Sequence, residues 1–340
     1  MTDPILKIDA VSKRFTRMPG LAERMIGKFT GGGKPVVVHA LSDVSLQVMK
    51  GEVLGVVGES GCGKSTLGRV VAGIHAPSSG SVTLNGQPIA DQRGGNIHKR
   101  TTQVQMIHQD PFASLNPRMK VGETLAEGPR HHDIIPARDV QARIRELLEQ
   151  VGLEGAYADR LPHQFSGGQR QRVAIARALA MQPEVLVLDE AVASLDVSIQ
   201  AQVLNLFMDL RRDLGLTAMF ISHDLSVVRH VCDRVAIMYL GRLVELAPAD
   251  RLYADPRHPY TRALFASVPT VGTGRGRFET IKGEIPSPID PPSGCAFHPR
   301  CPFAGPRCLV QVPELGALGQ GRTVACHLND GGVELQKGAA

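Results

Sequence analysis

The chain has 340 residues, of which 43% are hydrophobic and 21% are charged, and its formal net charge is +5. These values are ordinary for a globular protein of about two domains, and the mild charge indicates a scattered solvated surface rather than a dedicated anionic partner. No stretch approaches the roughly 20 apolar residues of a membrane-spanning helix, and Met1-Thr2-Asp3-Pro4 lacks the basic and apolar regions of a secretory signal. We therefore expect a cytoplasmic protein that reaches any membrane through partners.

The N-terminal part of the chain alternates strand-like runs with one helix. Residues 5–15 and 36–49 carry β-type patterns, and the apolar run 53–57 is typical of a strand buried on both faces. A helix is predicted from about Lys64, and its buried face should carry apolar residues at helical spacing, namely Leu67, Val70, Val71 and Ile74.

A phosphate-binding motif joins this strand to this helix. It fits the pattern G-x-x-x-x-G-K-[ST] and consists of Gly58, Glu59, Ser60, Gly61, Cys62, Gly63, Lys64, Ser65 and Thr66. Glycines let backbone N–H groups face phosphate oxygens, and the helix N-terminus adds partial positive charge. Lys64 would reach the β- and γ-phosphates and Ser65 would ligate Mg²⁺. Cys62 is interpreted as a spacer whose backbone alone takes part.

The middle of the chain continues the alternation of helices and strands. A helical stripe over 140–151 ends at Gly152, and a second stripe over 203–214 ends at Gly215. Strand-like runs occupy 185–188, 218–222 and 235–239. This alternation predicts parallel βαβ units and an α/β fold.

Two acids follow the apolar run 185–188. The C-terminal ends of parallel strands face the ligand crevice of an α/β sheet, so Asp189 and Glu190 should lie near the phosphate-binding motif. We expect Asp189 to hold Mg²⁺, directly or through water, and Glu190 to position and polarise the attacking water.

A glycine-rich helix start, Phe165-Ser166-Gly167-Gly168-Gln169, lies about 20 residues before Asp189. Ser166 can cap the helix that follows while exposed N–H groups bind an anion. The segment resembles the LSGGQ signature of ABC ATPases, with Phe in place of the first Leu.

Further motifs of that family stand in the same order along the chain. Gln109 is similar to the Q-loop glutamine, which senses Mg²⁺ and water. Asp196, in Ser194-Leu195-Asp196, is similar to the aspartate of the D-loop. His223 is similar to the switch histidine, which contacts the γ-phosphate. The adenine-stacking aromatic residue is best matched by Phe15, and His39 is the alternative.

The resemblance covers residues 5 to roughly 250 and implies an α/β P-loop NTPase fold of the ABC cassette type. Such a cassette has a parallel-sheet core, an antiparallel β subdomain and a helical signature subdomain, here at about 112–182. It implies a cassette over 1–255 and a small Cys- and Pro-rich C-terminal domain over 256–340. It also implies Mg²⁺-dependent ATP hydrolysis in a head-to-tail pair of cassettes, each signature closing the other's site.

Three segments resemble the dipeptide/oligopeptide importers of this family, specifically the second of their two ATPases: 109–118, 195–202 and 258–264. This implies a sister ATPase subunit, two permeases, an extracytoplasmic solute-binding protein, no nucleic acid, and a peripheral location at the cytoplasmic face of the plasma membrane. Peptide is the first expectation for the solute, and nickel, glutathione or another small solute are alternatives. A non-transport ABC ATPase and an Fe–S redox sensor that merely binds ATP are the rival classes.

Four of the six cysteines lie close to the C-terminus, at Cys295, Cys301, Cys308 and Cys326, with five, six and seventeen residues between them. These spacings are wider than the C-x₂-C pairs of ordinary zinc ribbons. Four thiolates suit either Zn²⁺ or a [4Fe–4S] cluster, and unmetallated thiols are the third possibility. The resemblance to the same importers implies the [4Fe–4S] cluster.

Overall fold

The computed structural model describes residues 3–18, 35–93, 96–110, 115–193, 195–267, 281 and 283–329. Its main sheet has eight strands in the order β13-β14-β12-β11-β3-β10-β9-β8. The bounds of the last six are β12 Arg242–Pro248, β11 Arg234–Tyr239, β3 Val53–Val57, β10 Thr217–Ile221, β9 Val185–Asp189 and β8 Val104–Ile107. The five strands from β11 to β8 are parallel, as the alternation of elements predicted. Their carboxyl ends therefore meet at one edge.

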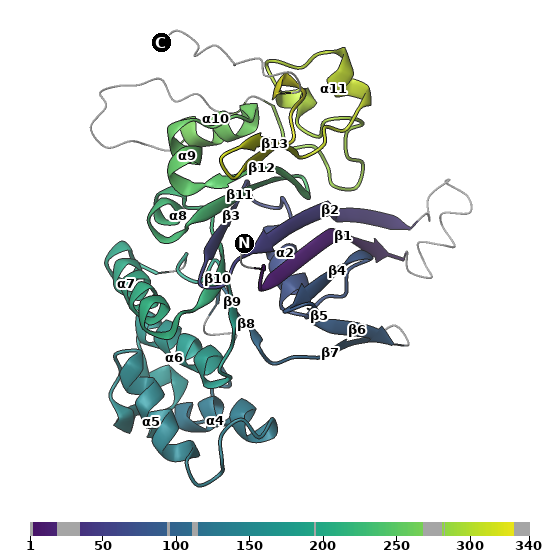
Figure 1. Cartoon of the computed structure of the whole chain (residues 1–340). Coiled ribbons are helices and arrows are strands. Elements are labelled where there is room, and N and C mark those ends of the chain that lie inside the picture. Colours follow the sequence, from purple (N-terminus) through teal and green to yellow (C-terminus); the bar gives the residue numbers. More distant parts are fainter. Residues whose placement is uncertain are drawn as a thin grey trace, which may run out of the picture.

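A second, antiparallel sheet lies beside the first (Figure 1). Its order is β2-β1-β4-β5, with β2 Val36–Val48, β1 Leu6–Arg17, β4 Ser79–Leu84 and β5 Gln87–Pro88. A two-stranded ribbon of β6 Ala90–Arg93 and β7 Asn96–Lys99 follows. The helix α2, Lys64–Val71, buries Leu67 and Val70 in the core shared with these strands. Ile74, predicted on that buried face, is instead 42% exposed, because the helix ends at Val71.

The helices α4 Val121–His131, α5 Val140–Gln150 and α6 Gly167–Ala180 form a group at the lower end of the molecule in Figure 1. Short 3₁₀ turns at Gly155–Asp159 and Pro162–Gln164 connect α5 to α6. The predicted end of α5 is confirmed, because Gly152 has the left-handed φ of 71° that follows many helices. The helices and the sheet share one core.

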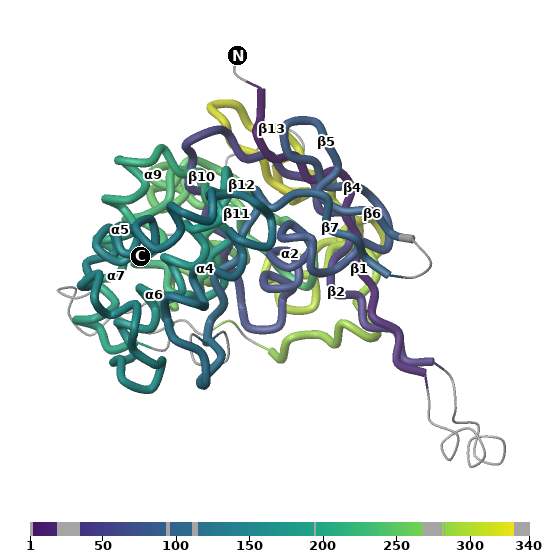
Figure 2. Tube along the Cα trace, turned by 90° about the horizontal axis from the view of Figure 1, so that it is seen from below, coloured from purple at the N-terminus to yellow at the C-terminus, as the bar shows by residue number. Residues whose placement is uncertain are grey.

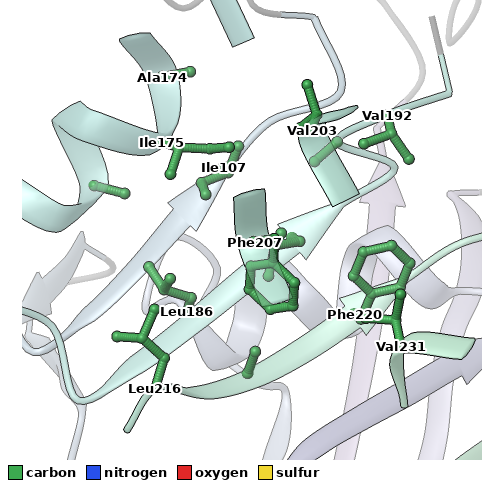
Figure 3. Close-up of a cluster of buried hydrophobic side chains, with 14 of the residues drawn as sticks. Ile107, Ala174, Ile175, Leu186, Val192, Val203, Phe207, Leu216, Phe220 and Val231 are labelled. Atoms are coloured by element: carbon green, nitrogen blue, oxygen red, sulfur yellow. The ribbon is translucent and has the colours of Figure 1, made fainter. Parts of the chain in front are cut away.

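Helix α7, Val197–Leu214, and helix α8, Leu225–Val231, pack against the main sheet. In Figure 3 the ring of Phe207 from α7 lies between Leu186 of β9 and Phe220 of β10. Gly215 ends α7 in the left-handed conformation, as predicted. Leu214, expected on the buried face, is 47% exposed at this end of the helix.

The C-terminal region is attached to the main sheet by hydrogen bonds. Strand β14, Arg322–Val324, pairs with β12 and with β13, Gly316–Gly319. The region also contains α9 Ala249–Ala254, α10 Pro259–Ala266, α11 Pro306–Val310 and 3₁₀ turns at His298–Arg300 and His327–Asn329. The boundary predicted after residue 255 thus falls between elements that share one sheet. Within the described ranges, no helix combines the length and the apolar character that crossing a bilayer requires.

Candidate active site

The nucleotide loop, residues 58–66, connects β3 to α2 as predicted. Gly58 and Gly63 have φ values of 157° and 105°. A Cβ atom on Gly58 would lie 2.2 Å from the Met238 carbonyl oxygen, and one on Gly63 would lie 2.4 Å from the Ala40 carbonyl oxygen. Only glycine fits at these two positions, since other residues would collide with backbone atoms.

Lys64 lies at the start of α2 and is only 4% exposed. Its Nζ donates hydrogen bonds to the carbonyl oxygens of Gly58, at 2.8 Å, and Glu59, at 3.0 Å. A buried ammonium group held by neutral carbonyl oxygens gains from an anion placed beside it. The first turn of α2 adds backbone N–H groups with no partner in the helix, so the loop suits a phosphate chain.

The two residues expected to bind Mg²⁺ contact each other. The Ser65 hydroxyl donates to Asp189 Oδ1 at 2.7 Å, and Asp189 is buried at the end of β9. A hydroxyl and a carboxylate oxygen beside the phosphate-binding loop are hard oxygen donors that suit Mg²⁺. The donor set therefore fits the metal that the sequence predicted.

Two predicted catalytic residues, Gln109 and His223, approach one carboxylate oxygen of a third, Glu190 Oε2. Gln109 Nε2 donates to it at 3.1 Å, and His223 Nδ1 lies 3.5 Å from it. Gln109 follows β8, Glu190 follows β9 and His223 follows β10, so the strand order explains the cluster. Glu190 has a φ of 49°, and its N–H donates to the Ile221 carbonyl oxygen at 3.0 Å. Such a conformation in a residue other than glycine is costly and is concentrated at functional sites.

The turn that carries His223 is fixed by its two neighbours. The Asp224 N–H donates to the Ser222 hydroxyl at 3.0 Å, and the Asp224 carboxylate accepts from the N–H groups of Ser226 and Val227 as the N-cap of α8. The His223 side chain is 59% exposed. The backbone is therefore fixed, while the ring is free to change partners.

The signature segment starts α6 as predicted. Ser166 is the N-cap, its hydroxyl accepts from the Gln169 N–H, and Gln169 Oε1 accepts from the Ser166 N–H at 3.0 Å. Figures 1 and 2 both place α6 apart from α2. Within one chain, the signature therefore lies away from the nucleotide loop.

Two signature glycines face the D-loop segment and α7. A Cβ on Gly167 would be 3.7 Å from Leu195, and one on Gly168 would be 2.4 Å from Ile199 Cγ2. Asp196 of the D-loop motif is the residue before α7, and Ser194 lies outside the described residues. The D-loop and the signature are thus packed together.

The two candidates for adenine stacking lie on paired strands. Phe15 on β1 is 38% exposed. The centroid of its ring lies 5.5 Å from the centroid of the His75 ring and 5.0 Å from Lys13 Nζ. His39 on β2 donates its backbone N–H to the Pro288 carbonyl oxygen at 2.9 Å. The exposed ring of Phe15 keeps it the better candidate for stacking on a base.

Cys62 is buried within the nucleotide loop. Burial raises the pKa of its thiol, and the nearby Lys64 only partly opposes this. A neutral, buried thiol is consistent with the predicted role as a spacer.

Two residues in contact with the loop were not expected from the sequence. The Glu59 N–H donates to the Tyr260 hydroxyl at 2.9 Å, and Arg300 donates to both oxygens of the Glu59 carboxylate, at 2.7 and 3.0 Å. Tyr260 lies 201 residues and Arg300 lies 241 residues from Glu59. No local pattern links such distant positions, so only the folded chain reveals the contact.

The four C-terminal cysteines line one small cavity, together with Phe297 and other residues. All six cysteines of the chain are free thiols. Burial raises the pKa of Cys295, Cys301 and Cys326, the last to about 12. In the described part of the chain, no three His, Cys, Asp or Glu side chains already stand close enough to hold a metal ion.

A groove of about 850 Å³ separates the main sheet from the helical group. Its walls come from the ends of α2 and β7, from β8, and from α4 and α6, and they include His108, Glu127 and Ala178. Burial lowers the pKa of His108, against an opposing effect of Asp189. Because His108 lines the groove and Gln109 is the next residue, the groove lies next to the cluster of Gln109, Glu190 and His223.

Comparisons with known proteins give matches over both parts of the chain. The ABC transporter family model matches residues 41–193, and the oligopeptide/dipeptide transporter C-terminal region matches residues 244–308. The probable peptide ABC transporter ATP-binding protein y4tS of Sinorhizobium fredii is 47% identical to this chain. The alignment covers 96% of this chain and 91% of the length of y4tS. The oligopeptide transport ATP-binding protein AppF of Bacillus subtilis is 46% identical over 96% of this chain and 98% of its own.

Solved structures agree with these matches. CbiO1 of Clostridium perfringens, part of an ABC transporter complex, has a TM-score of 0.59 and 28% identity over 74% of this chain and 92% of its own. A dimeric ATP-binding cassette in a post-hydrolysis state, bound to ADP and phosphate, has a TM-score of 0.58 and 25% identity over 72% of this chain and 98% of its own. The chain belongs to the ABC transporter family, within the group that carries the oligopeptide/dipeptide transporter C-terminal region.

Proposed function

We propose that this chain is the ATP-hydrolysing subunit of a membrane importer for di- and oligopeptides, bound peripherally at the cytoplasmic face of the membrane. The observation that carries the proposal is the convergence of Gln109, Glu190 and His223 beside the Ser65–Asp189 pair. A binding module for nucleotide would need the loop but not a carboxylate with two polar partners at the end of β9.

The nucleotide loop binds the triphosphate through its backbone N–H groups and Lys64. When the phosphates arrive, the Lys64 ammonium exchanges the carbonyl oxygens of Gly58 and Glu59 for phosphate oxygens. Ser65 and Asp189 would hold Mg²⁺, which offsets negative charge on the β- and γ-phosphates. Lys64, Ser65 and Asp189 already lie together at the loop, so binding would require these side chains only to exchange hydrogen-bond partners.

Glu190 orients the attacking water and accepts its proton, with Oε2 as the acceptor atom. Gln109 and His223 hold that carboxylate in position, and His223, being exposed, can turn toward the γ-phosphate. The Ser166–Gln169 helix start lies apart from the loop of its own chain, so a second cassette must supply it. A sister ATPase subunit is the proposed source.

Steady-state ATP turnover tests this assignment. Glu190→Gln should lower turnover by about 100-fold or more, the usual scale for losing a general base, and should leave nucleotide binding intact. Equal turnover by the wild-type chain and Glu190→Gln would favour the alternative of a sensor module that merely binds ATP.

The groove between the main sheet and the helical group is the proposed docking site for a permease segment. His108 lines the groove, and the next residue, Gln109, bonds to Glu190. A segment pressing on this end of β8 would therefore move a direct partner of the catalytic carboxylate. The chain of contacts from the groove through His108 and Gln109 to Glu190 would link permease binding to hydrolysis.

Peptide is the proposed solute because the relatives named above carry peptide or oligopeptide transport in their names. The solute itself is selected by the extracytoplasmic binding protein and the permeases. Ligand-induced thermal shift of the cognate binding protein with dipeptides, nickel and glutathione separates the alternatives, and a response to nickel or glutathione alone would contradict the peptide assignment.

We also propose that Cys295, Cys301, Cys308 and Cys326 ligate a [4Fe–4S] cluster that would fasten the loop-rich C-terminal region. The support is that all four thiols line one cavity. Ligation must deprotonate the thiols, and burial, which raises the pKa of Cys295, Cys301 and Cys326, opposes this, so the positive metal charge would be required to stabilise those thiolates. Iron and sulfide analysis of an anaerobic preparation tests this: zinc in their place, or a folded metal-free chain, would contradict it.

A further inference from the structure

The nucleotide loop contains one acidic residue, Glu59, among its nine positions. A carboxylate in a loop that binds a triphosphate repels the ligand unless its charge is neutralised. Arg300, from the C-terminal region, meets Glu59 in a two-pronged ion pair with distances of 2.7 and 3.0 Å. The Arg300 side chain is 4% exposed and the Glu59 side chain is 20% exposed, so water screens the pair little.

Glu59 is held at three points at once. Its carboxylate accepts hydrogen bonds from Arg300, and its N–H donates to the Tyr260 hydroxyl. Its carbonyl oxygen accepts a hydrogen bond from Lys64 Nζ. Two of these partners come from the C-terminal region and the third is the phosphate-binding lysine. A displacement of Glu59 would therefore disturb one of the two carbonyl oxygens that hold Lys64 Nζ.

The C-terminal side of this contact is rigidly packed. The Phe297 ring lies 5.2 Å from that of Tyr239 and 5.4 Å from that of Tyr260, and Tyr239 accepts a hydrogen bond from Arg300 at 3.4 Å. Arg300 ends the 3₁₀ turn that precedes Cys301, and Phe297 and Cys301 line the cysteine cavity. Aromatic packing thus fixes the guanidinium before nucleotide arrives.

We propose that Arg300 is a positioning residue for nucleotide binding: it neutralises Glu59 and, with Tyr260, fixes the nucleotide loop from the C-terminal region. This inference rests on the proposed function for the identity of the ligand. It gives the C-terminal region a direct effect on ATP affinity, through one ion pair.

The test is the affinity of the full-length chain for Mg²⁺-ADP, which is not hydrolysed, by isothermal titration calorimetry. Arg300→Met keeps the length of the side chain and removes its charge, and should weaken binding by about tenfold, within the range found for directly coupled groups. Arg300→Met combined with Glu59→Gln should recover most of that loss, because no unpaired carboxylate remains. Arg300→Lys, which keeps the charge and loses the two-pronged geometry, should give an intermediate loss.

The matched control is Arg322→Met, which removes another nearly buried arginine of the C-terminal region, paired with Asp255 and Glu245. It should lower the melting temperature and leave the affinity within about twofold of the wild type, since its partners lie outside the loop.

Three outcomes separate this inference from the proposed function. Unchanged affinity in Arg300→Met, or a double variant as weak as Arg300→Met, overturns the positioning role. If Arg300→Met fails to fold, Arg300→Lys decides, and wild-type affinity in that variant overturns the role. A wild-type chain that binds Mg²⁺-ADP but, together with its sister ATPase subunit, hydrolyses no ATP overturns the proposed function and leaves the Arg300 result standing.

Discussion

Ser65 and Asp189 illustrate how single side chains prepare the site. Their oxygen atoms are 2.7 Å apart although the residues are 124 positions apart in the chain. The carboxylate is 4% exposed, so its charge acts in a poorly screened environment. Such a charge attracts a divalent cation more strongly than a solvated carboxylate would.

Asp189→Asn should therefore raise the Mg²⁺ concentration needed for half-maximal ATP hydrolysis by about tenfold or more, the usual scale for losing a group that tunes a metal site. Asparagine keeps an oxygen that can accept from Ser65 but loses the charge. Asp213→Asn is the control, because Asp213 is exposed at the end of α7 and pairs with Arg212. Equal Mg²⁺ requirements in the two variants would contradict the assignment of Asp189.

At the scale of elements, α6 and α7 meet with no space for a methyl group at Gly168. A Cβ there would be 2.4 Å from Ile199 Cγ2. The helix that starts with the signature therefore keeps its position only while this residue is glycine.

Gly168→Ala should destabilise the chain by about 1–3 kcal/mol, the usual cost of overpacking. Adding Ile199→Ala removes the obstructing methyl group and should recover part of that loss in thermal unfolding. Gly167→Ala is the comparison, because its new methyl group would only touch Leu195 at 3.7 Å. A Gly168→Ala chain as stable as Gly167→Ala would show that α6 adapts freely.

Strand β12 supports the start of α10 through Glu245. Its buried carboxylate accepts the N–H groups of Arg257 and His258, both at 2.9 Å. Burial nevertheless raises the pKa of Glu245 above its ordinary 4.5. The folded chain therefore binds this proton more tightly than the unfolded chain, and the associated stability, present at low pH, is lost as the pH rises through the folded-state pKa.

Glu245→Gln cannot titrate at this position. It leaves one of the two N–H groups without its acceptor, a cost that does not depend on pH. The difference in melting temperature between variant and wild type should shift in favour of the variant as the pH rises from about 4.5 toward neutrality. Parallel curves for the two chains over this range would show that Glu245 does not retain its proton more tightly on folding.

At the scale of the whole molecule, the groove between the main sheet and the helical group is the proposed docking site for a permease segment. Glu127 of α4 is exposed and lines the groove, whereas Glu123, one turn earlier on the same helix, is exposed outside it. The two residues therefore form a matched pair.

Glu127→Trp should fill the groove and abolish association with the permeases and coupled transport, while ATP binding by the isolated chain persists. Co-purification with the permeases and uptake in reconstituted vesicles measure the effect. Glu123→Trp should leave both unchanged, since its side chain does not reach the groove. Normal uptake with Glu127→Trp would place the permease contact elsewhere.

Several features were determined by the sequence alone because they depend on nearby residues. The loop 58–66 and the Ser166–Gln169 helix start are such cases, since glycines and a capping serine act within one turn. The meeting of Gln109, Glu190 and His223 was also predictable, because parallel strands bring their carboxyl ends to one edge. Element ends were less predictable: Ile74 and Leu214 continue an apolar pattern but emerge into solvent where their helices stop.

The contact between the C-terminal region and the nucleotide loop is visible only in the folded chain. Arg300 precedes Cys301 in the sequence, and no nearby residue indicates that its partner is Glu59, 241 residues away. The same holds for the attachment of β14 to β12, which extends the main sheet. Such contacts depend on how the C-terminal elements pack over the end of β11, and packing between distant segments leaves no periodic pattern in either of them.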